Sequence, residues 1–282
     1  MGYRKMKKVL FILLLATISS GCRDKDRNFQ ANYPRLITFS PALTKITFDM
    51  GLGSHIVGVT TFCQVPAGQK RPLIGNSLNV RVEPILAVQP DIIVTQTDVK
   101  NFEPVIRVNS RIRVEKIVIE TLAEIAHAME QIGRIVNQPD VGKLTGKNFL
   151  KKINQIKQKT SQLPKRRVFF VLGYQNFSGP GRETFLDEMI SLAGGINIMS
   201  KNYTGWKKIS LETVISLDPD VIICQCESLQ RKQALAFWNN FAPDKPVFVV
   251  TDRYWTIPAG HLADYAAKLM DMIHQEQAKQ GD

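Results

Sequence analysis

The chain has 282 residues, of which 44% are hydrophobic and 22% are charged; these values are typical of a globular protein and exclude an intrinsically disordered one. The length accommodates two domains of ordinary size, each with its own core. The formal net charge is +12, and four of the positive charges lie within the first eight residues. The rest of the chain is only moderately basic and has no compact Lys/Arg cluster interleaved with aromatic residues, so nucleic-acid binding is not expected.

Residues 1–22 have the pattern of an export signal. A basic start is followed by an apolar run from Val9 to Ala16 and then by small residues. The run is too short to span a bilayer. Its ending resembles a bacterial lipoprotein signal, in which Cys22 is lipidated and becomes the mature N-terminus; ordinary secretion is the alternative. The polar residues 23–34 then predict a tether.

Residues 35–138 predict a first α/β lobe. A serine followed by a proline suits the start of a helix, since serine caps the free backbone N–H groups and proline fits the first turn. A Thr-x-x-Glu capping box opens a second helix. The expected elements are strands at 36–39, 56–59 and 113–119, a helix from Ser40 to about residue 50, and a helix from Thr121 to about residue 137.

A thirteen-residue pattern occurs twice, at 82–94 and at 211–223. In ungapped register Glu83 matches Glu212, and each copy ends in Pro-Asp followed by an apolar run. Glutamate in the first turn suits the positive end of a helix dipole, and proline stops the helix. The β-branched run is typical of a strand covered on both faces. We therefore expect one module of short helix, stop and buried strand in each of two similar lobes.

Residues 139–163 predict one long helix between the copies, because they contain few breakers and have apolar residues at helical spacing. About 24 helical residues span roughly 36 Å, which is long enough to bridge two lobes. Residues 164–282 then repeat the α/β pattern as a second lobe. The expected elements are strands at 168–172 and 248–251, a loop at 173–181, and helices at 184–193 and about 261–277. The basic run 165–167 is interpreted as a solvated strand edge.

Four stretches resemble the periplasmic substrate-binding proteins of ABC importers for cobalamin, haem and ferric siderophores. They are the strand, Ser-Pro turn and helix at 36–53 with the following Val-Gly-Val-Thr, the loop Thr-Phe-Cys-Gln-Val-Pro at 61–66, the two modules, and the helix with its Gly-Gly-x-Asn turn at 184–197. The resemblance covers about residues 35–276. The chain departs from the family at Gln64 and Val65, where Asp and Tyr are common, and at His261, where Arg is common.

The resemblance implies an α/β fold of two lobes, each with a central, mostly parallel sheet flanked by helices, joined by one long rigid helix that limits closure to a small hinge motion. It implies a monomer in the periplasm or at the cell surface that captures a corrinoid of the cobalamin type between its lobes. Haem and ferric siderophores are the alternative ligands. Delivery would be to an ABC permease dimer with its ATPase. Glu83 and Glu212 would then dock to permease arginines, the alternative being a helix-dipole role alone.

Ligands of open α/β sheets bind beyond the carboxyl ends of the strands. The loops at those ends are rich in aromatic residues, which suit a large flat ligand. The candidate ligand-binding residues are Phe62, Cys63, Gln64, Asn76, Tyr174, Phe177, Trp206, Tyr254, Trp255 and His261.

The metal chemistry of the chain stays open at this point. Cys63 and Cys226 facing across the cleft would suit a soft metal, whereas buried thiols or a disulfide would need none. His261 could ligate the metal of a bound chelate. No cofactor of the protein's own is expected. Since the chain has no Gly-x-Ser-x-Gly, His-Glu-x-x-His or Walker motif, a binding protein is favoured over an enzyme.

Overall fold

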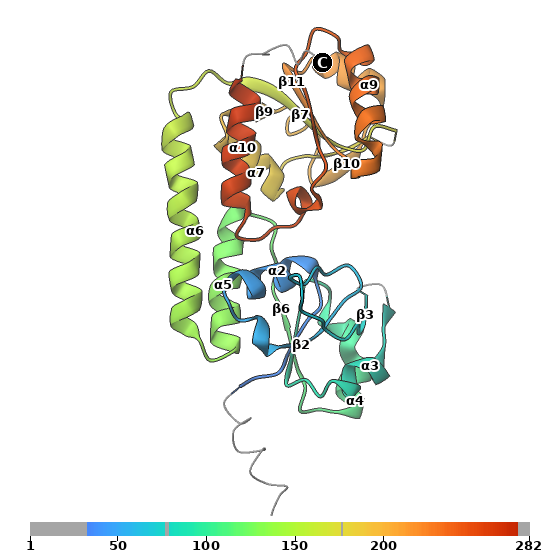
Figure 1. Ribbon diagram of the computed structural model, residues 1–282, viewed down its shortest axis with the longest axis vertical. Helices are drawn as coiled ribbons and strands as arrows, with labels where there is room; N and C mark the ends of the chain where they lie inside the picture. The colour runs from blue at the N-terminus through green and yellow to red at the C-terminus, as the bar shows by residue number, and fades with distance from the viewer. Residues whose placement is uncertain (1–32, 77–78, 176, 276–282) are drawn as a thin grey trace, which may run out of the picture.

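The computed structural model describes residues 33–76, 79–175 and 177–275. The predicted export signal, Cys22 and most of the tether lie outside these residues. Two α/β lobes are stacked end to end, and one long helix runs beside both of them (Figure 1). This is the predicted fold class. In the part of the chain that is described, no helix is both long enough and apolar enough to span a membrane.

The first lobe is built on a four-stranded, all-parallel sheet with the strand order β2-β1-β5-β6. Strands β1 and β5 are central and completely buried, as their apolar runs predict. A small β3–β4 hairpin lies beside this sheet. The strands are β1 Leu36–Thr38, β2 Ile56–Val59, β3 Gly75–Asn76, β4 Asn79–Val80, β5 Ile92–Thr95 and β6 Arg113–Lys116; the helices are α2 Pro41–Asp49, α3 Val82–Ala87, α4 Glu103–Val108 and α5 Leu122–Ile135.

The second lobe has a mixed sheet with the order β10-β8-β7-β11-β12, and β9 also pairs with β7. Strands β7, β11 and β12 are parallel, whereas β8 and β10 form an antiparallel edge. The strands are β7 Arg166–Leu172, β8 Ser178–Pro180, β9 Gly195–Asn197, β10 Trp206–Lys208, β11 Val221–Gln225 and β12 Val247–Val250; the helices are α7 Phe185–Leu192, α8 Leu211–Leu217, α9 Arg231–Phe241 and α10 Leu262–His274.

Some elements differ from the prediction. The loop expected at 173–181 contains the antiparallel strand β8, whose three residues carry too little pattern to be read as a strand. Helix α9 and the short helix α4 were not predicted from the sequence. The basic run at 165–167 is not simply a solvated edge, because Arg166 donates to the carbonyl of Ile273 at 2.8 Å and Arg167 caps α8.

Each repeated module is held by an arginine, which directly precedes β1 in the first lobe and lies on β7 in the second. In the first lobe, Arg35 Nε donates to Gln89 O at 2.9 Å, a second guanidinium nitrogen donates to Val88 O at 2.9 Å, and the Arg35 backbone N–H donates to Asp91 at 2.8 Å. These bonds satisfy carbonyl groups that the end of α3 leaves free. The residue after the helix, Gln89, has a φ of 43°, so the chain turns left-handed before proline is reached.

The second module repeats this arrangement atom for atom. Arg167 Nε donates to Asp218 O at 2.9 Å, its guanidinium also donates to Leu217 O, and its backbone N–H donates to Asp220 at 2.7 Å. Asp218, with a φ of 37°, occupies the left-handed position. The sequence repeat is therefore also a repeat of backbone geometry and of helix capping.

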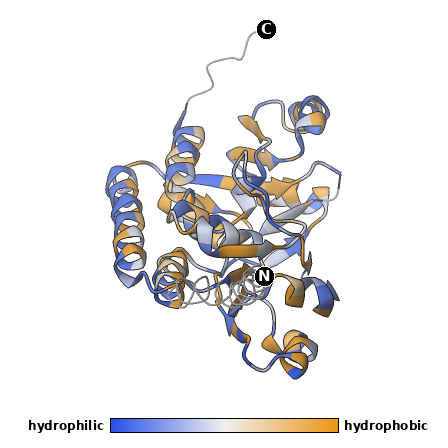
Figure 2. Cartoon of the chain, turned by 60° about the horizontal axis from the view of Figure 1, so that its bottom comes forward, coloured by the Kyte–Doolittle hydropathy of each residue, from blue (hydrophilic) through white to orange (hydrophobic). Residues whose placement is uncertain are grey.

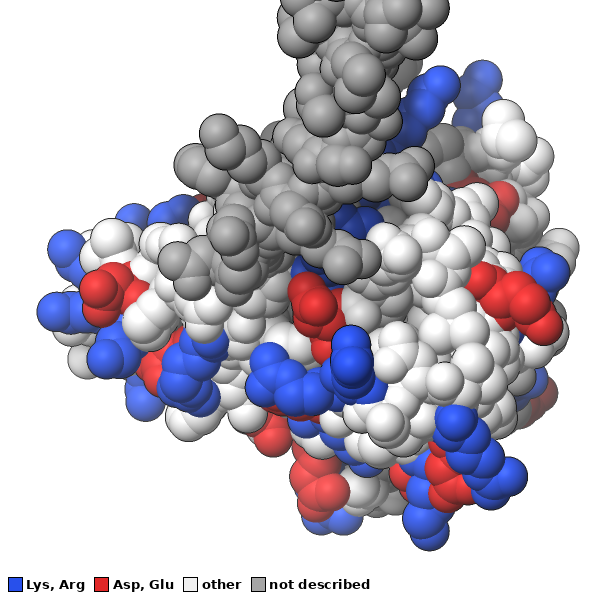
Figure 3. All heavy atoms as spheres, turned by 90° about the horizontal axis from the view of Figure 1, so that it is seen from below, with Lys and Arg blue, Asp and Glu red and all other residues white. Residues whose placement is uncertain are grey.

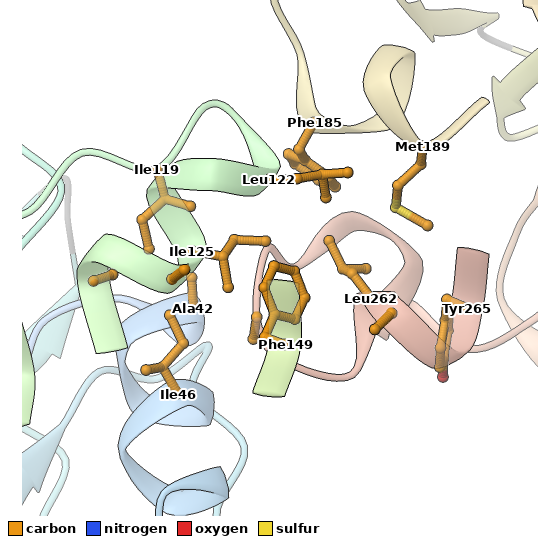
Figure 4. Close-up of a cluster of buried hydrophobic side chains, with 14 of the residues drawn as sticks. Ala42, Ile46, Ile119, Leu122, Ile125, Phe149, Phe185, Met189, Leu262 and Tyr265 are labelled. Atoms are coloured by element: carbon orange, nitrogen blue, oxygen red, sulfur yellow. The ribbon is translucent and has the colours of Figure 1, made fainter. Parts of the chain in front are cut away.

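One hydrophobic core runs through both lobes. Helices α5 and α6 (Pro139–Thr160) pack side by side, and α6 also packs on α7 and α10 of the second lobe. Figure 4 shows where they meet: Ile125 from α5 and Phe149 from α6 lie between Ile46 of the first lobe and Leu262 of the second. At about 1.5 Å per residue, the 22-residue α6 is about 33 Å long, which suits a helix in contact with both lobes.

Glycines allow α5 and α6 to approach closely. A Cβ added at Gly142 would lie 2.6 Å from Met129 O, and one at Gly133 would lie 2.9 Å from the Gly142 Cα. A Cβ at Gly146 would lie 3.1 Å from Ala126 O. The two helices thus touch backbone to backbone along this seam, so a larger side chain would force them apart.

Candidate functional site: the edges between the lobes

The carboxyl ends of the two sheets face each other. Helix α2 leaves the carboxyl end of β1, and the 3-10 turn at Arg253–Thr256 follows β12. These two segments meet, because Lys45 Nζ on α2 lies 5.4 Å from the centre of the Tyr254 ring. We call this meeting point the inter-lobe floor, defined by Lys45, Asp49, Asp252, Tyr254 and His261. It is the place where ligands of such sheets are expected.

Polar groups hold the floor together. Lys45 forms an ion pair with Asp49 one turn later on α2. On the second-lobe side, Asp252 accepts a hydrogen bond from the Tyr254 backbone at 2.9 Å and another from the Tyr265 hydroxyl. Burial, the Asp252 hydrogen bond and the Asp252 charge together raise the pKa of Tyr265, so its hydroxyl stays protonated and donating at neutral pH.

Within this floor, the His261 ring lies between the rings of Tyr254 and Tyr265, whose centres are 5.2 and 5.0 Å away. Its Nε2 lies 2.9 Å from Tyr254 O and donates to that carbonyl, whereas its Nδ1 is buried without a hydrogen-bond partner. Burial lowers the pKa of His261, and Lys45 adds to this effect. The ring is therefore neutral near pH 7, with a free lone pair on Nδ1.

The predicted residues of the first lobe lie on and behind its rim. Phe62 is exposed (61%), and Gln64 and Asn76 are half-buried. Cys63 is turned toward its own lobe: its sulfur lies 3.0 Å from the hydroxyl oxygens of both Thr44 and Thr60. Those contacts engage the thiol within the first lobe and leave Phe62 as the aromatic surface of this rim.

The second-lobe aromatics divide into a half-buried pair and an exposed tryptophan. Tyr174 and Phe177 contact the ring of Phe237 on α9, at 6.2 and 5.7 Å between ring centres. Trp206 is 38% exposed on the edge strand β10. The first two are therefore anchored by α9, an element that the sequence did not reveal, whereas Trp206 has free ring surface.

Trp255 belongs to the core in this structure. It is 2% exposed and packs against Phe170 and Tyr265, with ring centres 6.1 and 4.6 Å away. The expectation from its polar, proline-containing loop was a side chain facing the cleft. The 3-10 turn at Arg253–Thr256 instead turns Tyr254 toward the first lobe and Trp255 inward.

The two remaining cysteines lie inside the second lobe. Cys224 and Cys226 are 0% and 3% exposed, and the structure has no disulfide among Cys63, Cys224 and Cys226. Burial raises the pKa of Cys224 to about 12 and also raises that of Cys226, so both are neutral thiols at pH 7. Within the described residues no three His, Cys, Asp or Glu side chains are grouped as metal ligands would be.

The repeated glutamates are both exposed in the first turn of their helices, Glu83 on α3 and Glu212 on α8. Ser210 caps α8, and its hydroxyl lowers the pKa of Glu212, as does the Glu212 backbone N–H. Helix α3 has no side-chain cap. Both side chains are therefore exposed at matching positions of the two modules.

A separate depression of about 490 Å³ lies at the opposite, amino ends of β5 and β6. Gln89, Asp91, Val108 and Arg111 are among its lining residues. Figure 3 views the first-lobe end and shows acidic and basic side chains mixed over this face. The depression is open and lies on the wrong edge of the sheet for a cleft ligand, so we do not assign the ligand to it.

Sequence reasoning missed Lys45, Asp49, Asp252 and Tyr265, which complete or support the floor. Lys45 and Asp49 were detectable as an i,i+4 pair on a predicted helix. Their approach to the second lobe was not detectable, since it depends on how the lobes are placed.

Two α/β lobes that turn the carboxyl ends of their strands toward each other have the architecture of a two-lobed binding protein. The family model for periplasmic binding proteins matches residues 36–259, and the chain belongs to that family. A vitamin B12-binding protein of Vibrio campbellii is 26% identical over 219 residues, which are 76% of this chain and 79% of that protein. A vitamin B12-binding protein of Yersinia pestis is 24% identical over 206 residues, 72% of this chain and 74% of that protein.

Solved structures show the same fold. The periplasmic vitamin B12-binding protein BtuF of Vibrio cholerae has a TM-score of 0.74 at 19% identity, covering 86% of this chain and 97% of that one. The periplasmic haem-binding protein HutB of Vibrio cholerae also has a TM-score of 0.74, at 20% identity, covering 86% and 99%. The neighbours thus include binders of both corrinoid and haem.

Proposed function

We propose that the protein captures a corrinoid of the cobalamin type between its lobes, outside the cytoplasm, and delivers it to an ABC permease dimer with its ATPase. The observation that carries this proposal is the meeting of the two carboxyl edges at the inter-lobe floor, with Phe62 and Trp206 exposed on the two lobes. Exposed aromatic rings supply contact area to a large flat ligand at low entropic cost. The relatives named as vitamin B12-binding proteins support the corrinoid.

The proposed contacts are ordered by exposure. Phe62 and Trp206 would touch the ligand directly, with Gln64 and Asn76 beside them and Tyr254 at the floor. Tyr174 and Phe177 would shape the second-lobe wall, since Phe237 holds them in place. Trp255 and Cys63 would support the site from behind. A lipid on Cys22 would keep the protein at the membrane where the permease lies.

Haem is the second candidate, and His261 favours it. A neutral imidazole with an unpartnered nitrogen is the usual protein ligand of haem iron. In this structure Nδ1 is buried, so haem ligation would require the floor contacts to open.

The test is a side-by-side titration of the exported chain with cyanocobalamin, haemin and a ferric siderophore, followed by tryptophan fluorescence and by absorbance. Micromolar or tighter binding of cyanocobalamin alone supports the corrinoid. A shifted haemin absorbance band that disappears in His261→Ala supports haem. Binding of the siderophore alone would rule out both corrinoid and haem as the ligand. If none of the three compounds bound, the proposed function would be overturned.

A matched pair of variants locates the ligand. Trp206→Ala should weaken binding about tenfold, because an aromatic contact of this kind contributes roughly 1–2 kcal/mol. Val108→Ala removes a more exposed apolar side chain (64% against 38% for Trp206) at the far end of the first lobe and should leave binding unchanged. Equal affinity of the two variants would place the ligand away from Trp206.

A further inference from the structure

The outward side of α6 is strongly basic. The helix contains six lysines and one aspartate, for a net charge of +5. Only one of these lysines, Lys152, has an ion-pair partner among the described residues, namely Asp264 at 2.9 Å. Figure 1 shows α6 at the outer edge of the molecule, with α5 and α10 on its inner side only.

These charges form one face with two leucines between them. At 100° per residue, one side of the helix carries Lys143, Lys147, Lys151 and Lys157 together with Leu144 and Leu150, and the exposed Asp140 in the first turn lies on the same side. The lysines are exposed, and the leucines are 61% and 40% exposed. We call the four lysines and the two leucines the basic face of α6; the opposite side holds the buried glycines and Phe149.

Nothing in the fold requires this face. Lysines four residues apart, as at 143, 147 and 151, repel one another and weakly destabilise a helix. The exposed leucines on this face contribute no hydrophobic stabilisation, because their apolar surface stays in water. Lysines alternating with apolar side chains are instead typical of helices that lie in a membrane interface, where the lysine stems cover apolar surface and the ammonium groups meet lipid phosphates.

We propose that the basic face of α6 lies on an anionic phospholipid bilayer. Four to eight clustered lysines suffice for attraction to such a surface. This inference rests on the proposed function in one respect, the lipid on Cys22, which would hold Tyr33 within about 36–40 Å of the membrane. The start of the described chain and the start of α6 both lie at the lower end in Figure 1, so the tether brings α6 within reach.

The orientation has a functional consequence. Helix α3, strand β10 and the gap-facing loops lie on the side of the molecule away from α6 (Figure 1). A protein resting on α6 therefore turns the inter-lobe edges and Glu83 away from the membrane, which leaves the site open to incoming ligand. Docking to a permease requires release from this resting state. In Figure 2 the outer helix at the left is mostly hydrophilic with isolated hydrophobic positions, as this arrangement requires.

The experiment compares sedimentation of the exported chain carrying Cys22→Ser with phosphatidylcholine vesicles and with vesicles that also contain phosphatidylglycerol. The unlipidated chain should bind only the anionic vesicles, and salt should weaken binding by screening. The quadruple variant Lys143→Gln, Lys147→Gln, Lys151→Gln and Lys157→Gln should lose binding roughly tenfold or more. A matched variant with Lys70, Lys100, Lys116 and Lys232 changed to Gln removes the same charge from exposed sites elsewhere and should keep it.

Each outcome is decisive. Equal loss in both quadruple variants would mean that net charge alone drives binding and would overturn the assignment to α6, as would absence of binding to anionic vesicles. Tighter binding of soluble heparin than of the vesicles to the same face would overturn the bilayer as the partner. The ligand titration on the same proteins separates this inference from the proposed function, because the α6 variant should bind ligand normally.

Discussion

The two copies of the repeated module are alike in backbone and different in surroundings. Both end a short helix with a left-handed residue, and both receive three hydrogen bonds from one arginine. In the first lobe that arginine is half-buried, whereas in the second lobe it is exposed. Only the second helix has a serine cap. Local residues therefore determine the shape of the module, while the surroundings of each arginine determine how strongly the module is held.

The largest expected effect comes from breaking the core that keeps the two modules in one body. Gly142→Leu should destabilise the protein by about 3 kcal/mol or prevent folding, because its Cβ would meet Met129 O at 2.6 Å. Urea unfolding followed by circular dichroism measures this. Lys143→Leu places the same side chain on the exposed neighbour and should cost little. Equal stability of the two variants would show that the seam does not constrain the lobes.

Removing the capping arginine should lower the free energy of unfolding by different amounts in the two modules. Arg35→Ala should cost about 2 kcal/mol, because it removes two charge-assisted bonds, of which the one to Val88 is partly buried and the one to Gln89 is exposed. Arg167→Ala should cost about 1 kcal/mol, since its bonds are exposed to water. Arg107→Ala, which breaks only an exposed i,i+4 pair, is the control. A larger loss for Arg167→Ala in thermal unfolding would reverse our account of the difference.

Glycine substitutions at the two module residues with positive φ, Gln89 and Asp218, should have the smallest effect on the free energy of unfolding, and they should raise it. Gln89→Gly should stabilise the protein by about 1 kcal/mol, because glycine adopts a positive φ without strain. Asp218→Gly should gain less, since aspartate tolerates this conformation better and the change also removes the ion pair with Lys245. Gln89→Ala keeps the strain and should show no gain. Equal stability of the Gly and Ala variants would argue against strain at this turn.

Sequence patterns predicted what depends on neighbouring residues. The Ser40 cap, the Thr121–Glu124 capping box, the buried strand of each module and the long helix all follow from such patterns, and the structure contains them. Side chains whose position depends on packing against distant parts of the chain were harder to predict from the sequence. Trp255 is buried because α10 packs over it, and Tyr174 and Phe177 lean on α9, whose amphipathic pattern is weak. Lys45 belongs to the candidate site because it contacts Tyr254 of the other lobe, and this contact depends on how the two lobes are placed.

We propose that this binding protein presents Glu83 and Glu212, one from each module, to the permease. The most direct measurement is ligand uptake by cells that carry the double variant Glu83→Arg and Glu212→Arg, together with ligand binding by the same purified protein. We predict that uptake is lost while binding affinity is unchanged, and that Glu103→Arg, an exposed first-turn glutamate outside the modules, supports normal uptake. Normal uptake by the double variant would contradict the claim.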